Sequence, residues 1–534
     1  MVRTQANDGT VTTVLLVEEG MYGTKGRVRG GRRRPVRVSG LSPWAYLPHR
    51  LGVERAVIAP PDWVDFRPSR RKRTVESAFR SPSMASSPPT EYTLTRPMSS
   101  PTAAAEAVAA SARRKVAWRL LPLLLALYVV AYLDRANLGF AKLQMKEAEK
   151  EWFTDEVFGW GAGLFFIGYL VLEIPGALLV ERWSARKWFA RILVTWGVIS
   201  MAMAAVDNVP QFYLTRFLLG LAEAGFYPGV IVYFTHWFPK RDRGRAMAAM
   251  ILGVPGSLAL GAPVSALLLK LGWFWLKGWQ WLFLVEGAPA VVLGVLVLFL
   301  LPDRPRDARW LTLEERDWLE RTLDAERRET RAVAGEVSVG RVLRHPVVWL
   351  LAAGIFATNL GGYSLVFWLP TAVKGLFAAD DTTVLALTGV IYLAAMAGVW
   401  LSGQSSDRTG DRKWHCVAGQ VGAAVFLTLA MTSGQPAVVV FGWLMLTGLC
   451  AHGWPTPFWA LPSTALTASA AAVAVGVINM AANFAGFVGN AVVGSLQERG
   501  VSLPTCLVGA AAGYALGGLL VAVIPVPKPA RSKG

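Results

Sequence analysis

The sequence predicts an all-α membrane protein whose twelve transmembrane helices form two six-helix halves. Of its 534 residues, 53% are hydrophobic and 17% are charged, whereas soluble domains carry about a quarter charged residues. The mean hydropathy is +0.39, and long apolar runs recur between residues 118 and 525. Because such runs suit a lipid environment and not a water-facing surface, a soluble multidomain protein is excluded.

The number of spans follows from the apolar runs, since a helix needs about 20 residues to cross about 30 Å of hydrocarbon. Residues 113–301 hold six runs and residues 346–525 hold six more, separated by a polar linker at 302–345 and followed by a tail at 526–534. The halves are expected to repeat one fold. The expected spans are 118–141, 157–179, 187–206, 210–235, 245–270, 279–301, 347–371, 382–404, 414–433, 436–460, 468–494 and 503–525.

The first 112 residues contain no run long enough to span a membrane, and they are rich in Arg, Pro and Ser. Basic clusters lie at Arg32–Arg34 and Arg70–Arg73, in a chain of net charge +18. We expect residues 1–112 to be a disordered basic arm. One alternative is a polybasic segment for acidic lipid or nucleic acid, and another is translation that starts at Met84 or Met98.

The polar linker contains a helix start signal. Thr312–Glu315 has the capping-box pattern, in which the first and last side chains bond each other's backbone N–H groups. Alternating charges follow it, with Trp318, Leu319 and Leu323 at helical spacing. We therefore expect a surface helix that joins the two halves.

Basic residues in the short loops indicate the orientation. Lys and Arg precede the first span and gather between spans two and three, four and five, and eight and nine. All these loops lie on one side of the predicted bundle, and an excess of positive charge marks the cytoplasmic side. We expect a multi-pass protein of the plasma membrane with both termini in the cytoplasm.

An internal repeat supports the division into halves. The loop Glu181–Trp188 and the loop Asp407–Trp414 have an acid, two Arg, a Lys and a Trp at the same positions. Two ordinary basic loops would supply the charges but not this shared register. Parallel repeats are the architecture of transporters whose site lies between the halves, and ion pairs in such loops can hold one gate state. The candidate gate residues are Gly176, Glu181, Arg182, Arg186, Gly403, Asp407, Arg408 and Arg412.

The repeated loop resembles the signature loop of the major facilitator superfamily. Further stretches are similar to its anion:cation symporter family, whose members carry tartrate, phthalate, nicotinate, glucarate and galactonate. The resemblance covers about residues 115–525 and departs from the pattern at Ala177, often Asn in the family, and at Ser184, usually Gly. The matching stretches are Tyr132–Asn137, Glu173–Gly176, Arg216–Gly229, Trp237–Pro239 and Phe367–Thr371.

Four charged residues fall inside the first and fourth spans. Each ionised side chain at the centre of a span costs about 2.5 to 3.5 kcal/mol on insertion scales. Depths counted at 1.5 Å per residue place Asp134 and Arg216 at similar levels, and Glu223 lies two turns from Arg216 on the same face. We expect Asp134, Arg135, Arg216 and Glu223 to form one buried network. The alternative is a pair of permanent salt bridges that only fix helix packing.

The residue types indicate a proton-coupled anion site. The planar guanidinium of Arg135 suits a substrate carboxylate and keeps its charge, whereas Asp134 and Glu223 can take up protons because burial and nearby Arg residues act oppositely on a carboxyl group. The resemblance implies that Asp134 and Glu223 carry the coupling protons and that Arg135 binds substrate. It also implies that Arg216, within the same substrate site, organises the acids.

The spans of the second half contain almost no charge. Asn479, Asn483 and Asn490 share one helical face, where their amides could bind a substrate or bond neighbouring helices. Thr456, between two prolines, is expected at a helix break that frees backbone groups. By resemblance Thr456 and Asn479 match substrate-contacting positions, with Asn483 beside them. The aromatic candidates for the cavity wall are Tyr132, Tyr363 and Trp368.

The function predicted is import of a small organic anion with protons by alternating access. An exporter or uncoupled facilitator of the same fold is the alternative. An integral membrane enzyme is disfavoured, since no HExxH, GxSxG or CxxC pattern occurs, and a transporter-derived sensor rests on the basic arm alone. We expect a monomer in the lipid bilayer with no cofactor, metal or nucleic-acid partner. Glu173 is expected to pair with loop arginines, and Glu286 is interpreted in the same way, whereas His236 and His452 are given no role.

Overall fold

A computed structural model describes residues 2–7, 10–17, 20–27, 103–333, 339–432, 434–466 and 468–526. The chain divides into residues 1–94 and residues 95–534. In the first unit, β1 (Val2–Asn7), β2 (Thr10–Val17) and β3 (Gly20–Arg27) form an antiparallel sheet in the order β1-β2-β3. β-Branched Val and Thr, which favour strands, dominate β2. The basic clusters at residues 32–34 and 70–73 lie outside the described residues.

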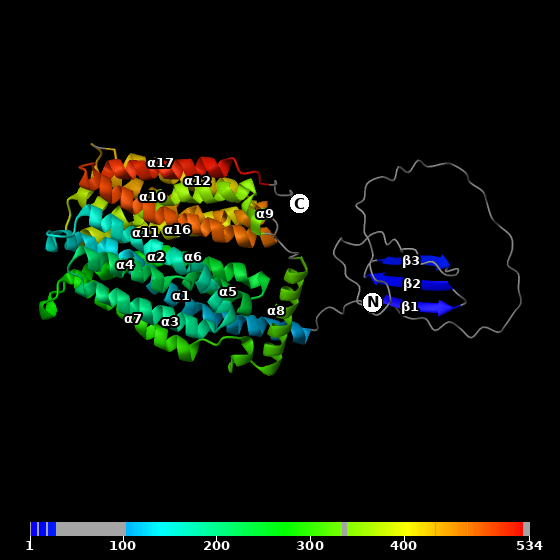
Figure 1. Cartoon of the computed structure of the whole chain (residues 1–534). Helices are drawn as coiled ribbons and strands as arrows, with labels where there is room; N and C mark the ends of the chain where they lie inside the picture. Colours follow the sequence, from blue (N-terminus) through cyan, green and yellow to red (C-terminus); the bar gives the residue numbers. More distant parts are fainter. Residues whose placement is uncertain are drawn as a thin grey trace, which may run out of the picture. The chain divides into compact units, whose positions relative to one another are not determined.

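The second unit is helical (Figure 1). Its first helix begins ten residues earlier than the predicted arm allows, at Ala103. The helices of the first half are α1 (Ala103–Ala148), α2 (Asp155–Arg182), α3 (Ala185–Ala202), η2 (Met203–Ala205), α4 (Val209–Glu223), α5 (Phe226–Trp237), α6 (Lys240–Leu268), η3 (Trp273–Trp275) and α7 (Gly278–Leu300).

The linker and the second half continue the helical unit. The linker holds η4 (Pro305–Asp307), α8 (Leu313–Val333) and α9 (Val339–Leu343). The second half comprises α10 (Pro346–Phe377), α11 (Asp381–Thr409), α12 (Lys413–Ala430), α13 (Ala437–Gly453), α14 (Pro455–Phe458), α15 (Leu461–Ala465), α16 (Ala468–Glu498) and α17 (Leu503–Ala522).

The predicted spans correspond to these helices, with two broken spans and one weak one. Within the described residues, eleven segments are long and apolar enough to cross a membrane, and α4–α5 and α13–α15 each count as one. The predicted span that is not among these eleven is 414–433. It corresponds to α12, which packs against α13 and α17. Its first turn contains Lys413 and His415, and Gln420 lies further along. These polar residues lower its mean hydropathy below that of the other spans.

Helix α8 lies across one end of the bundle (Figure 1), which we call the α8 end. The end where α1 finishes and α2 begins is the far end. The predicted capping box starts α8: the Glu315 N–H donates to Thr312 Oγ1 at 3.2 Å, and the Thr312 N–H donates to Glu315 Oε2 at 2.9 Å. Glu315 also forms an ion pair with Lys115 of α1, at 2.8 Å.

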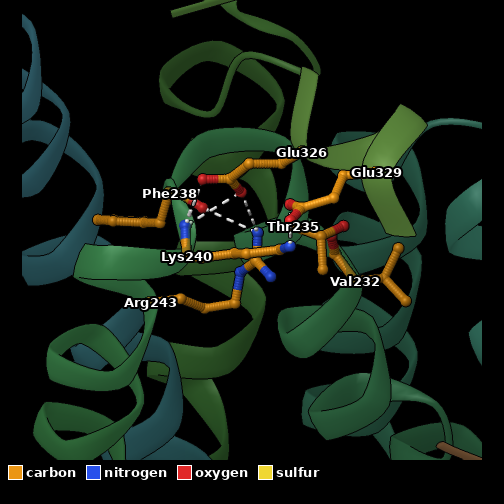
Figure 2. Close-up of polar contacts among 7 residues, drawn as sticks. All are labelled: Val232, Thr235, Phe238, Lys240, Arg243, Glu326 and Glu329. Atoms are coloured by element: carbon orange, nitrogen blue, oxygen red, sulfur yellow. Dashed lines mark hydrogen bonds and ion pairs between the residues drawn. The ribbon is translucent and has the colours of Figure 1, made fainter. Parts of the chain in front are cut away.

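A second set of contacts holds the other end of α8 to α6 (Figure 2). The Glu326 carboxylate accepts the backbone N–H of Lys240 at 2.9 Å and pairs with Arg243 at 3.5 Å. Glu329 pairs with the Lys240 side chain at 2.7 Å. Because Lys240 opens α6, Glu326 caps that helix. These contacts fasten α8 to the first half.

The two halves meet along three helix pairs: α2 with α16, α6 with α11, and α1 with α10. At the far end α2 and α16 approach so closely that a Cβ on Gly159 would lie 2.8 Å from the Gly494 Cα. Nearby, the Ser495 hydroxyl donates to Glu156 at 3.1 Å. The space between the halves is therefore closed at the far end.

Candidate functional site

A cavity of about 210 Å³ lies between the two halves. Aromatic and polar side chains dominate its wall, and both halves contribute. The lining residues from the first half include Tyr128, Tyr132, Arg135, Tyr169, Glu223 and Tyr227. Those from the second half include Asn359, Tyr363, His452, Trp454, Trp459, Asn479, Asn483 and Tyr514.

The charged part of the wall is an ion pair between Arg135 and Glu223, which bridges α1 and α4. Glu223 is the last residue of α4, and Gly225 follows it in a left-handed conformation with φ of 84°. The broken span thus ends at the cavity, as in transporters whose interrupted helices form the substrate site.

Aromatic rings surround the Arg135 guanidinium, and one polar atom on each side of the ion pair forms no hydrogen bond among the described residues. Its Cζ lies 5.0 Å from the centre of the Tyr132 ring and 5.5 Å from that of Tyr169, distances typical of cation–π contacts. Arg135 Nε and Glu223 Oε2 have no hydrogen-bond partner among the described residues. Both groups therefore retain capacity to bind a ligand or to exchange partners.

Among the described residues, Asp134 and Arg216 make no hydrogen bond or ion pair with this pair, but both interact electrostatically with Glu223, so the predicted network is joined by charge and not by direct contact. Asp134 is 1% exposed; it accepts hydrogen bonds from Trp196 Nε1 at 2.5 Å and from the Ser200 hydroxyl, both on α3. It also accepts one from Asn137. Consecutive helix residues point about 100° apart, so Asp134 faces α3 while Arg135 faces the cavity.

Arg216 is fully buried outside the cavity wall. Its Nε donates to the Gly161 carbonyl of α2 at 3.2 Å, and its Cζ lies 5.2 Å from the centre of the Phe165 ring. Nη1 and Nη2 have no hydrogen-bond partner among the described residues. Because buried N–H groups without a hydrogen-bond partner are costly, the two Nη groups make Arg216 a candidate to receive an acid in another state of the site.

Glu173 of α2 makes a contact that was not expected. It is 5% exposed, and its carboxylate accepts hydrogen bonds from Asn479 Nδ2 and, at 3.2 Å, from Asn483 Nδ2. The prediction that Glu173 pairs with loop arginines was wrong. It lies nine residues before the end of α2, about 13 Å from the loop, whereas α16 packs directly against α2.

The asparagines of α16 divide into two groups. Asn479 and Asn483 line the cavity, while Asn490 is buried and donates to the Gly486 carbonyl of its own helix at 2.8 Å. The predicted break at Thr456 is present, since α13 ends at Gly453 and α14 begins at Pro455. Thr456 itself is not a lining residue, and its hydroxyl is buried without a hydrogen bond among the described residues.

Of the three predicted aromatic residues, Tyr132 and Tyr363 line the cavity and Trp368 does not. Trp368 is fully buried, with the Lys142 ammonium 3.4 Å from its ring centre. Lys142 also pairs with Asp155 at 2.9 Å. Since Lys142 and Asp155 belong to the first half and Trp368 to the second, these three residues form a latch between the halves at the far end.

The repeated loops differ in their contacts. In the first, Asp303 accepts the Arg186 backbone N–H at 2.9 Å and the Ser184 hydroxyl. In the second, Arg412 pairs with Asp407 at 2.5 Å, and Arg408 is exposed. The side chains of Glu181 and Arg182 lie outside the described residues. Of the two motif glycines, Gly176 packs on Gly225 and Gly403 faces Thr456.

Several site residues were missed from the sequence. Glu173, Tyr169, Tyr227 and Tyr514 line the cavity or contact its wall. In the sequence, these residues are distinguished only by being polar or aromatic within an apolar run. Residues that merely pack between helices have the same feature, so it does not identify a site. Within the described residues no group of three His, Cys, Asp or Glu could hold a metal ion.

Comparison with known proteins gives the relationships of the chain. Residues 124–490 match the Major Facilitator Superfamily. The chain is 40% identical over 411 residues to an Agrobacterium vitis protein named as a tartrate transporter, which covers 76% of this chain and 92% of that one. It is 37% identical over 392 residues to a Pseudomonas putida protein named as the metabolite transport protein NicT, covering 72% and 87%.

The fold has solved counterparts. The xylose transporter XylE from E. coli, in a partially occluded inward-open conformation, has a TM-score of 0.62 and 16% sequence identity. The match covers 78% of this chain and 99% of that one. At this identity the likeness concerns the fold alone.

Proposed function

This chain belongs to the Major Facilitator Superfamily, whose members are transporters and not enzymes, and we propose that it imports a small organic anion together with protons. The observation that carries this proposal is the ion pair between Arg135 and Glu223 in the cavity wall. A guanidinium suits a carboxylate, and the tartrate name of a relative that is 40% identical supports the same class of substrate.

The pair couples anion binding to protonation. In the empty site Glu223 occupies Arg135, so a substrate carboxylate must compete with it. A proton on Glu223 neutralises that carboxylate and frees the guanidinium for the substrate. The spare Nη groups of Arg216 can stabilise a displaced acid. Proton and anion therefore favour each other's binding, which is the requirement for symport.

Asp134 serves as a second proton site in this proposal. It does not line the cavity but adjoins Arg135 in sequence, and it accepts hydrogen bonds from α3. Protonation would exchange an acceptor for a donor and disturb those bonds. Asp134 can thus link protonation to the packing of α1 against α3.

Alternating access requires the far-end contacts to break. We place the α8 end in the cytoplasm of a plasma-membrane protein, because basic loops gather there. The far end then faces outward, and its contacts close the outer side of the cavity. Opening it would release Trp368 from Lys142 and separate α2 from α16.

The test is uptake into proteoliposomes with an imposed pH gradient, using sugar acids, aromatic acids and dicarboxylates. Accumulation of at least one anion with the outside acidic is expected, and an ionophore that collapses the gradient should abolish it. Transport of none of the anions would overturn the proposal. Downhill uptake that ignores the gradient would instead identify a facilitator, and gradient-driven extrusion would identify an exporter.

The matched variants are Glu223→Gln and Glu329→Gln. The first removes the coupling carboxylate and should abolish accumulation while sparing exchange of anion across the membrane. The second removes an exposed acid of α8 that pairs with Lys240 of α6, and this variant should accumulate substrate normally. Full accumulation by Glu223→Gln would remove Glu223 from the coupling role.

A further inference from the structure

The Glu173 carboxylate lies directly behind the second-half wall of the cavity. Its Oε1 accepts from Asn479 and its Oε2 from Asn483, and both asparagines line the cavity. Two amide N–H donors, one to each oxygen, favour the ionised form of this carboxyl group, because hydrogen bonds donated to a carboxylate stabilise its negative charge. The amides of the second half therefore rest on a negative charge that belongs to the first half.

The charged groups around Glu173 give the cavity a polarity. Arg135 of α1 interacts electrostatically with Glu173. Once Glu223 is neutralised, Arg135 supplies a positive charge on one wall, while Glu173 supplies a negative charge behind the amides of the other. For an elongated ligand, a carboxylate is therefore attracted at the Arg135 end of the cavity and repelled at the Glu173 end.

The amides add a requirement for hydrogen bonding. One N–H of each asparagine is engaged by Glu173, which fixes the amide planes and leaves each carbonyl oxygen and one N–H for the ligand. Neutral hydroxyl groups both donate and accept, so they satisfy such amides. A second carboxylate only accepts, and it would lie one amide away from the ionised Glu173.

We propose that Glu173 determines specificity: it makes the site prefer an acid with one carboxylate and a hydroxylated, neutral tail over a dicarboxylate of the same length. The carboxylate binds Arg135 and the tail binds Asn479 and Asn483. This inference rests on the proposed function, since it names the anion class for the same site. Glu173 acts through the two asparagines and is therefore a positioning residue.

Two probes separate the alternatives, D-gluconate and D-glucarate. They share a six-carbon hydroxylated chain and differ only in the last group, a primary alcohol or a second carboxylate. Proteoliposome uptake of labelled gluconate is measured at fixed pH with each acid as competitor, which gives the ratio of their inhibition constants. Wild-type protein should prefer gluconate by on the order of tenfold, the scale of one largely screened charge repulsion.

Three variants test the cause of the preference. Glu173→Gln keeps the shape but removes the charge, and its ratio should fall to about one. Glu173→Asp keeps the charge and should keep the preference. Glu286→Gln removes another buried acid of the first half, one that bonds Ser265 on α6, and it should leave the ratio unchanged. The ratio of the two inhibition constants is the measured quantity. If Glu173 only supported the structure, its loss would weaken the binding of both acids equally and leave this ratio unchanged.

The outcomes distinguish this inference from the proposed function. If wild-type protein takes up neither acid and no other organic anion, the proposed function fails. If it transports organic anions but prefers glucarate or shows no preference, only the specificity inference fails. An unchanged ratio in Glu173→Gln also overturns it. Should that variant not fold, the wild-type ratio and Glu173→Asp still decide.

Discussion

The two halves of the bundle share a fold but divide the chemistry between them. Buried charged side chains of the first half include Asp134, Arg135, Glu173, Arg216 and Glu223, whereas the buried polar side chains described in the second half are neutral. The cavity lies between them. The neutral set is Thr358, Ser364, Thr388, Ser406, Gln420, Thr447, Asn483 and Asn490.

This asymmetry suggests a division of labour during transport. In the proposed function the first half holds the charges that bind anion and proton, so their mutual interactions would persist when the halves move against each other. The second half supplies amides and aromatic rings, which can lose a partner at a smaller cost than a charge. The contacts that must change, Glu173 with Asn479 and Lys142 with Trp368, each join a charge of the first half to a neutral group of the second.

If charge in the first half anchors the substrate, Arg135→Gln should remove binding. The expected loss of affinity is on the order of 100-fold, because the variant removes the guanidinium and leaves Glu223 unpaired. Arg135→Lys keeps the charge but not the planar fork, so it should bind more weakly than wild-type protein. Binding is measured by calorimetry on purified protein. Unchanged affinity in Arg135→Gln would move the anchor elsewhere.

Asp134→Asn tests whether the first half also carries the second proton. The variant cannot ionise, and its amide N–H faces the donors Trp196 and Ser200. Accumulation against the pH gradient should fall by about tenfold, a usual coupling between sites, while exchange continues. The measurement is gradient-driven uptake beside exchange in the same vesicles. Equal loss of both would indicate damage to packing instead.

Changes in the second half should be milder. Asn483→Ala removes one amide from the cavity wall, and affinity should fall by roughly 2- to 10-fold, the value of one hydrogen bond. Asn490→Ala is the matched control, because Asn490 bonds its own helix, and its affinity should equal that of wild-type protein. A loss in Asn483→Ala as large as that in Arg135→Gln would end the proposed division of labour.

The far-end latch should shift the balance of conformations modestly. Lys142→Met removes the charge between Asp155 and Trp368, and opening of the far end should become roughly threefold more frequent. Cross-linking between Glu156→Cys and Ser495→Cys reports closure, since these side chains meet across the halves. Lys146→Met removes an exposed partner of Asp155 and should change the yield less. An unchanged yield in Lys142→Met would exclude the latch.

The attachment of α8 should affect stability and leave transport intact. Burial alone would raise the pKa of Glu315, but hydrogen bonds from Lys115, the Thr312 N–H and Ser111 lower it to about 2. Because this is below the unfolded value of about 4.3, the carboxylate stabilises the fold above pH 4.3, and the contribution is lost as pH falls toward 2. Glu315→Gln should lower the free energy of unfolding by about 1 kcal/mol at pH 7.

Thermal unfolding of the purified protein measures this effect between pH 7 and pH 3. The difference in melting temperature between wild-type protein and Glu315→Gln should become smaller as the pH falls. A difference that stays constant over this range would show that the Glu315 charge does not hold α8. Normal uptake by the variant would confirm that α8 fastens to the first half without entering the site.

The sequence identified which residues carry chemistry, but not all of their partners. Arg135, Glu223, Tyr132, Tyr363, Asn479 and Asn483 were predicted for the site and do line the cavity. Asp134 and Arg216, which were predicted in one network with them, interact electrostatically with Glu223 but form their hydrogen bonds with α3 and α2. Glu173 was assigned to the wrong neighbours, and Trp368 lies at the far end. The error at Trp368 concerns its depth along α10, and the other errors concern the direction in which a side chain points.

The reason is physical. Apolar length, basic loops, proline breaks and the capping box at Thr312 act over a few residues, so the spans, the halves and the helix starts could be inferred from the chain alone. Which helices become neighbours, and how each is rotated, depends on close packing of small residues along whole helices, as where Gly159 meets Gly494. That packing turned Glu173 toward α16 and Asp134 toward α3, and it set the polarity of the cavity.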